Sequence, residues 1–276
     1  MSKLSIAIVG VVIAAFAALA YVFWPARTPV LVVADPPAPI TAPASVPTLP
    51  AILHPIEAAA SAPEPAASAP PPLPVLADAG DAVKAMLIDL LGRKAVLSLL
   101  QPEDFIRHVV TTVDNLPRNH VAPAVWPVVP TPGRFTVLSK DGTEVINPDN
   151  SQRYVPLVLL AESVDVATVA AAYRRLYPLF QQAYEELGYP GRYFNDRLVE
   201  VIDHLLATPA APKLPAVTLT EVKGPIPSNR PWVRYEFADP KLQSLSAGQR
   251  ILLRTGDVNQ RRLMARLRDL RKQITR

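Results

Sequence analysis

An apolar run at residues 4–24, LSIAIVGVVIAAFAALAYVFW, constrains this chain more than any other feature. As a helix, a run of this length rises about 30 Å, which matches the hydrocarbon core of a bilayer. A helix also satisfies its own backbone hydrogen bonds, as the lipid interior requires. The run therefore predicts a single-pass transmembrane helix that anchors the rest of the chain to one side of a membrane.

The charges beside this run predict which side that is. Lys3 precedes it, Arg27 follows it, and the next basic residue is Lys84. Because basic residues near a span favour the cytoplasmic side, this distribution favours a cytoplasmic N-terminus and a C-terminal part outside the cytoplasm. A cleaved signal peptide is the alternative, since residues 18–20 (ALA) fit a cleavage site. However, the apolar run continues beyond that site.

The next segment, residues 25–77, has a different composition. It contains 15 of the chain's 32 prolines, and between residues 28 and 77 the only charged side chains are Asp35, Glu57 and Glu64. Proline fixes φ and removes a backbone donor, so this composition excludes long helices and central strands. It predicts a disordered linker with polyproline II character, either a passive spacer or a ligand for a proline-recognising partner.

Residues 78–276 predict one α+β domain, dominated by helices and containing a small antiparallel sheet. Apolar residues at helical spacing predict helices over 78–91, 102–116, 165–187, 192–207, 246–253 and 259–274. Alternating apolar residues and turn signals predict strands over 134–139, 144–146, 217–222 and 232–237.

Local signals refine this outline. Asp78 or Asp81 is expected to cap the first helix, because a carboxylate accepts from the free N–H groups of a helix start. Pro102 is expected at the first position of the second helix. Between these helices, residues 95–100 predict a short apolar turn, and the apolar stretch 154–160 is expected to be buried.

The composition gives no support to a catalytic or metal site. The chain has no cysteine, which excludes disulfides, thiolate metal ligands and a cysteine nucleophile. The four histidines are not at metal-ligand spacing, and neither a serine nucleophile motif nor a glycine-rich phosphate loop occurs. We expect no cofactor and no metal, and the sequence leans against an enzyme without excluding one.

Tyrosine is concentrated in one region, since five of the eight tyrosines lie between residues 173 and 193. Tyr173, Tyr177 and Tyr184 share one helical stripe with Phe180. Tyrosine combines an apolar ring with a polar tip and is enriched at binding surfaces. The stripe is therefore either the core face of its helix or an aromatic groove, rimmed by arginine, for a peptide or a glycan.

The C-terminal segment is basic. Residues 241–276 contain ten Lys or Arg and two acidic residues, whereas the whole chain has a net charge of +4. The last helix predicts a candidate basic face made of Arg261, Arg262, Arg266, Arg268, Arg271 and Lys272. It is either the solvated face of a packed helix or a docking surface for anionic lipid or an acidic partner. The compartment makes nucleic acid an improbable partner.

Three stretches resemble a known family: residues 112–118 (TVDNLPR), 191–209 (GRYFNDRLVEVIDHLLATP) and 245–249 (LSAGQ), which leads into ILLRTG. The chain resembles an uncharacterised family of bacterial membrane-anchored proteins, known only as a domain of unknown function (number three thousand and fourteen). The resemblance covers roughly residues 78–276 and implies a bacterial envelope protein, which together with the charges beside the apolar run places the anchor in the inner membrane and the domain in the periplasm. It brings no activity, cofactor or catalytic residue.

These observations together define a candidate binding surface, which consists of Tyr173, Tyr177, Tyr184, Tyr189, Arg192, Tyr193, Asn195, Asp196 and Arg197. The leading hypothesis is a single-pass inner-membrane protein that presents a periplasmic interaction or scaffold domain on a long flexible tether. Its partner is expected to be an envelope protein or a cell-wall component. The alternative is a periplasmic enzyme, or a module that binds cell-wall glycan or peptide, using the region from Tyr173 to Tyr193.

Overall fold

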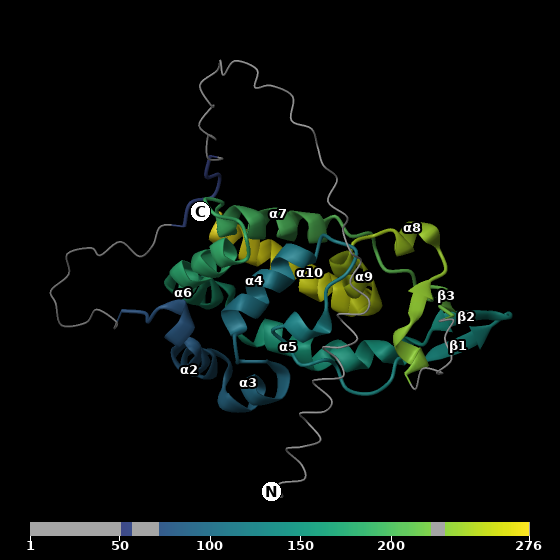
Figure 1. Cartoon of the computed structure of the whole chain (residues 1–276). Helices are drawn as coiled ribbons and strands as arrows, with labels where there is room; N and C mark the ends of the chain where they lie inside the picture. Colours follow the sequence, from purple (N-terminus) through teal and green to yellow (C-terminus); the bar gives the residue numbers. More distant parts are fainter. Residues whose placement is uncertain (1–50, 57–71, 222–229, 276) are drawn as a thin grey trace, which may run out of the picture. The chain divides into compact units, whose positions relative to one another are not determined.

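A computed structural model of the chain describes residues 51–56, 72–221 and 230–275, all within one unit, Thr48–Arg276 (Figure 1). The transmembrane helix predicted at 4–24 and most of the predicted linker lie outside the described residues. Within those ranges no single helix has the length and hydropathy to cross a membrane. That length and hydropathy are reached only when two consecutive helical segments, Pro148–Ser163 and Val166–Glu186, are taken together. The two segments meet at a bend of 81°.

Four helices form the centre of the domain: α4 (Phe105–Asn115), α6 (Val166–Glu186), α7 (Phe194–Leu206) and α10 (Asp257–Ile274). Both α6 and α7 contact α4 and α10, and the four lie side by side in Figure 1. Each carries apolar residues at helical spacing, so one face of each is buried. Val110, Phe180 and Phe194 meet in this main core.

Shorter helices cover the central four. The segment before α4 contains η1 (Leu76–Asp78), α2 (Gly80–Leu91) and α3 (Arg93–Leu99). The later ones are η2 (Pro123–Val125), η3 (Pro148–Tyr154), α5 (Val155–Ser163), η4 (Pro231–Val233), α8 (Pro240–Gln243) and α9 (Ala247–Arg254). The helix-dominated domain expected from the sequence is therefore confirmed.

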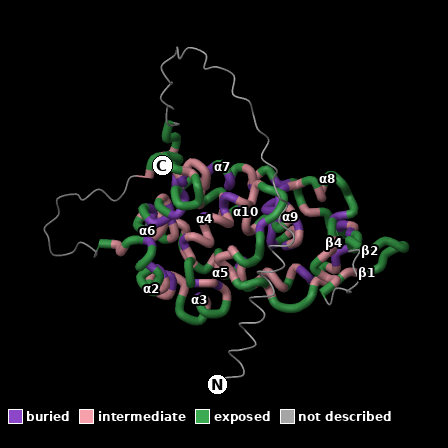
Figure 2. The backbone as a smooth tube through the Cα atoms, in the orientation of Figure 1, coloured by how far each residue is buried: buried purple, intermediate pink, exposed green. Residues whose placement is uncertain are grey.

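The strands form two antiparallel hairpins. β1 (Val137–Lys140) pairs with β2 (Thr143–Ile146), and β3 (Val217–Leu219) pairs with β4 (Tyr235–Phe237). A bridge between Val145 and Ala216 joins the hairpins, which lie at the opposite end of the domain from α2 and α6 (Figure 1). Figure 2 shows that much of β1 and its turn is exposed, so this end contributes little to the main core.

Several local expectations were wrong. Neither Asp78 nor Asp81 caps α2, whose N-cap is Ala79. The turn expected at 95–100 is the helix α3, which begins directly after Gly92, where a positive φ of 82° separates it from α2. The second helix does not start at Pro102, because the left-handed backbone of Asp104 (φ 50°) delays α4 to Phe105.

Two further differences concern burial. Of the apolar stretch 154–160, only Val158 is fully buried, and Leu159 is 52% exposed. Tyr154, Leu157 and Leu160 line an apolar cavity. In the region predicted to be linker, residues 51–56 lie on the domain and Leu76 belongs to the main core. Ordered structure therefore extends further toward the N-terminus than residue 78.

Replacing Gly248 by alanine is expected to lower the free energy of unfolding by about 1–3 kcal/mol. Gly248 lies in α9 against α4 and α7, and its N–H donates to the carbonyl of Leu116 at 2.9 Å. A Cβ at this position lies 2.6 Å from Cδ2 of Leu205, so a side chain forces the helices apart. Gly80→Ala is the matched control, because no atom lies within 4 Å of a Cβ there. Urea denaturation checks both, and equal stability of the two variants contradicts the close approach.

Candidate functional site

The site is built at the N-terminus of α7, where Asn195 joins three parts of the chain. Its side chain is completely buried. The amide nitrogen donates to the carbonyls of His54 (2.9 Å) and Ile274 (3.0 Å), and the amide oxygen accepts from the hydroxyl of Tyr173 (3.1 Å). A buried amide with every bond made fixes its neighbours, because losing any partner leaves a polar group unsatisfied.

The start of α7 has no capping side chain of its own, and α6 supplies the acceptors. The N–H of Phe194 donates to the side-chain oxygen of Gln181 at 2.9 Å, and the N–H of Asn195 donates to the hydroxyl of Tyr177 at 3.3 Å. Tyr177 in turn donates to Gln181 at 3.0 Å. These bonds satisfy N–H groups that every helix start leaves free, and they set the position of α7.

Residues 51–56, Ala-Ile-Leu-His-Pro-Ile, lie against this helix start. The N–H groups of Leu53 and His54 donate to the two carboxylate oxygens of Asp196 at 3.0 and 2.7 Å. The Tyr193 hydroxyl accepts from the N–H of Ile56 at 2.6 Å and donates to its carbonyl at 3.5 Å. All these bonds use main-chain atoms of the bound segment. Figure 1 shows the segment, in dark blue, beside the C-terminal end of α10.

A network of charged side chains, centred on the buried carboxylate of Asp114, lies beside the site. Asp114 on α4 is 3% exposed, and its carboxylate accepts from Nε of Arg197 at 3.1 Å. It also accepts from Arg118 at 2.5 Å and from the hydroxyl of Tyr189 at 3.1 Å. Of the other two guanidinium nitrogens of Arg197, Nη1 donates to Glu200 at 2.9 Å and Nη2 donates to the carbonyl of Asp114 at 3.1 Å. Two arginines on one carboxylate offset its desolvation and hold α4 against α7.

A polar pocket of about 580 Å³ opens between this network and the docked segment. It is lined by Ala51, Leu53, Asp114, Tyr184, Tyr189, Arg192, Tyr193, Asp196, Arg197 and Glu200. The docked segment does not fill it, since Leu53 is 72% exposed. The pocket therefore offers charged and aromatic groups beside a site that holds peptide backbone.

The sequence left open whether the predicted tyrosine stripe faces the core or a groove, and the structure gives different answers for different tyrosines of this region. Tyr177 and Tyr184 are buried in the main core. Tyr189 stacks on Tyr184 with ring centroids 4.7 Å apart, and Tyr193 lies 5.2 Å from Tyr177. The stripe is thus core at Tyr177 and Tyr184, and the two tyrosines that follow the helix, Tyr189 and Tyr193, reach the candidate site.

Above pH 10, the hydroxyls of the innermost tyrosines are expected to lose their protons only as the chain unfolds. Burial raises the pKa of Tyr173 and Tyr177 well above the usual value of about 10. Stability from their neutral hydroxyls is therefore fully present below pH 10 and is lost as pH rises through the raised pKa. Tyrosinate absorbance should reach its full value only as the helical circular dichroism disappears. Complete titration of all eight tyrosines in the folded chain contradicts this.

The predicted basic face divides into two groups. Arg262 pairs with Glu162, Arg266 donates to the carbonyls of Ala161 and Val164, and Arg271 pairs with Asp203. These three bind α10 to the rest of the domain. The other three, Arg261, Arg268 and Lys272, are exposed. Pairing with Arg271 also holds the pKa of Asp203 below its usual range.

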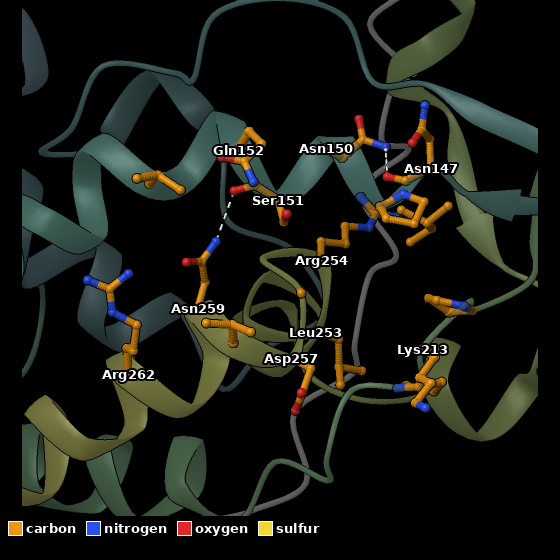
Figure 3. A pocket seen from close by; sticks show the side chains of 17 residues that line it. Asn147, Asn150, Ser151, Gln152, Lys213, Leu253, Arg254, Asp257, Asn259 and Arg262 are labelled. Carbon is orange, nitrogen blue, oxygen red and sulfur yellow. Dashed lines mark hydrogen bonds between the residues drawn. The ribbon is translucent and has the colours of Figure 1, made fainter.

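Two other cavities lie elsewhere in the domain. A pocket of about 380 Å³ lies between η3 and the junction of α9 and α10 (Figure 3). Two of its amides already have partners: Asn259 donates to the carbonyl of Ser151 at 2.9 Å, and Asn150 donates to the carbonyl of Asn147 at 2.7 Å. These two side chains hold loops together.

A second cavity, of about 680 Å³, is apolar and lies between α4, α5, α10 and the loop at 121–131. Leu157, Leu160 and Leu267 are among its lining residues. This cavity is the reason that the stretch 154–160 is less buried than expected. Across the part of the chain that the structure describes, no cluster of three His, Asp or Glu side chains is arranged to hold a metal ion.

The site contains residues that the sequence did not single out. Asp114 lies within the stretch TVDNLPR, and its one signal was an acid beside apolar positions of a helix. The segment 51–56 gave no signal within the proline-rich region. The three stretches of the resemblance meet in space, since Arg197 binds Asp114 and the N–H of Ala247 donates to the carbonyl of Arg118 at 2.7 Å.

Comparison with known proteins gives one match. A family model described as "Protein of unknown function (DUF3014)" matches residues 105–271, which include Asp114, the start of α7 and most of α10. No curated protein and no solved structure matches the chain.

Proposed function

The chain belongs to the family of proteins of unknown function DUF3014, and from its own site we propose that it is a membrane-tethered module that binds peptide. In this proposal residues 4–24 anchor it in the bacterial inner membrane, with the N-terminus in the cytoplasm. The domain works in the periplasm, where its partner is an envelope protein. The apolar run and the proline-rich segment that follows support the tethered arrangement.

One observation carries the choice of ligand: Tyr193, Asn195 and Asp196 hold residues 51–56 through main-chain N–H and C=O groups. Side chains that bind main-chain N–H and C=O groups recognise peptide backbone, with side-chain pockets adding specificity. This favours peptide over glycan among the ligands considered for the region from Tyr173 to Tyr193. Binding of the exposed part of the basic face to anionic lipid stays a prediction.

Photocrosslinking in cells tests the proposal. A photoreactive residue is placed at Arg192 or at Glu200, both exposed beside the site, and at Lys140 on β1 as a control at the other end of the domain. We expect one discrete protein adduct from the first two positions, mapped to a segment of the partner and lost when Asp196→Ala is added. Crosslinks confined to the chain itself, or the same adducts from Lys140, contradict the proposed function.

A further inference from the structure

We infer that residues 51–56 are a resident ligand, so that the peptide site is occupied by the chain itself and a partner peptide has to displace this segment. The inference rests on the proposed function and adds its regulation. The segment contributes no bond that a separate peptide could not make, because Asp196 and Tyr193 contact only its main chain.

The contacts define the class of peptide that fits. Two successive N–H groups, those of Leu53 and His54, meet the carboxylate of Asp196. The next residue is Pro55, which has no N–H, so a bound peptide needs no hydrogen-bond donor at this position. Ile56 then packs against both the main core and the cluster formed by α6, α7 and α10. The site therefore selects a segment with two free amides at a bend, followed by a proline and an apolar residue.

The adjacent pocket gives an external peptide an advantage. At its rim, Arg192 is the one charged lining residue with no side-chain hydrogen bond or ion pair among the described residues. The resident segment places Leu53 there, and Leu53 gains little contact. A peptide with an acidic side chain at the Leu53 position adds an ion pair with Arg192, worth up to about a fivefold gain in affinity for an exposed pair.

The covalent connection of residues 51–56 to the domain explains how a segment with low affinity keeps the site occupied. Residues 57–71 connect it to the domain, and a ligand on so short a connection competes at an effective concentration of about a millimolar. The apparent dissociation constant of an external peptide is its intrinsic value divided by the fraction of sites that the segment leaves free. The free peptide Ala-Ile-Leu-His-Pro-Ile has the same sequence as the resident segment and has to compete with it for the site. We therefore expect this peptide to bind the intact chain weakly.

Release also changes the reach of the proposed tether. With residues 51–56 docked, the chain between the end of the predicted anchor and the domain spans at most about 90 Å. Once they leave, the first residue packed on the core is Leu73, and the limit rises to about 160 Å. Displacement by a partner peptide therefore lets the domain move further from the membrane.

The test is binding of the fluorescent peptide Ala-Ile-Leu-His-Pro-Ile, and of the same peptide with Glu at the Leu53 position, to the full chain. His54→Pro removes an N–H that binds Asp196 and changes none of the side chains that form the site. We expect this variant to bind the peptide at least about tenfold more tightly than the unchanged chain. Ile52→Ala is the control, because Ile52 is 55% exposed, and it should bind like the unchanged chain.

The outcomes separate the two claims. Equal binding to the unchanged chain and to His54→Pro leaves a peptide site but overturns self-occupancy. Binding to neither, or binding to His54→Pro that survives Asp196→Ala, overturns both the inference and the proposed site. An advantage of the Glu peptide that disappears in Arg192→Ala supports the assigned register, and no advantage contradicts the role of Arg192.

Discussion

Replacing Asp114 by alanine is expected to lower the free energy of unfolding by about 3–5 kcal/mol, the cost of breaking a buried ion pair from one side. The carboxylate is almost fully buried and accepts from Arg197, Arg118 and Tyr189. Its removal leaves the guanidinium of Arg197, which is only 20% exposed, without its main partner. The effect should appear as a lower midpoint of urea denaturation with an unchanged slope.

Glu200→Ala is the matched control for this prediction. Glu200 also pairs with Arg197, at 2.9 Å, but its side chain is 67% exposed. An exposed ion pair contributes about 0–1 kcal/mol, so this variant should stay close to the unchanged chain. If the two variants lose equal stability, the burial of Asp114 is not the source of the effect.

Replacing Asn195 by alanine is expected to lower the free energy of unfolding by about 2–4 kcal/mol and to release residues 51–56. The reason is that alanine leaves the Tyr173 hydroxyl and the carbonyl of Ile274 buried without partners. Asn195→Asp is a sharper variant, because it keeps the acceptor for Tyr173 but turns a carboxylate oxygen toward two carbonyls. Its loss of stability should therefore be relieved by acid, which protonates that carboxylate.

Tyr173→Phe serves as the control for Asn195. It removes a single hydrogen bond of 3.1 Å and should cost about 1 kcal/mol, with residues 51–56 still docked. Thermal denaturation of the full chain compares the three variants. A loss for Tyr173→Phe as large as that for Asn195→Ala means that the aromatic packing, and not the amide, joins the three parts.

Much of the fold followed from local patterns. The apolar spacing of α6 and the cap at Asp165, which accepts from the N–H groups of Ala167 and Thr168, are properties of adjacent residues. The same holds for the turn Asp141-Gly142, where both residues have positive φ. Such features depend on short segments of the chain, so the sequence predicts them well.

The site could not be predicted in the same way, because its bonds join distant residues. Arg197 and Asp114 are 83 positions apart, and each alone is an ordinary charged residue of a helix. The docking of residues 51–56 uses main-chain groups, which leave no pattern in the side chains. The ion pairs of the basic face could not be predicted for a similar reason, since the acids that pair with Arg262 and Arg271 lie on other helices.

Hydrogen–deuterium exchange of the full-length chain, followed by mass spectrometry, tests the central claim most directly. The claim is that residues 51–56 occupy a peptide site formed by Tyr193, Asn195 and Asp196. We predict slowed exchange at the amides of Leu53, His54 and Ile56, and faster exchange there after Asp196→Ala, while α7 itself keeps its protection. Unprotected amides in the unchanged chain, or protection that survives Asp196→Ala, would contradict the account.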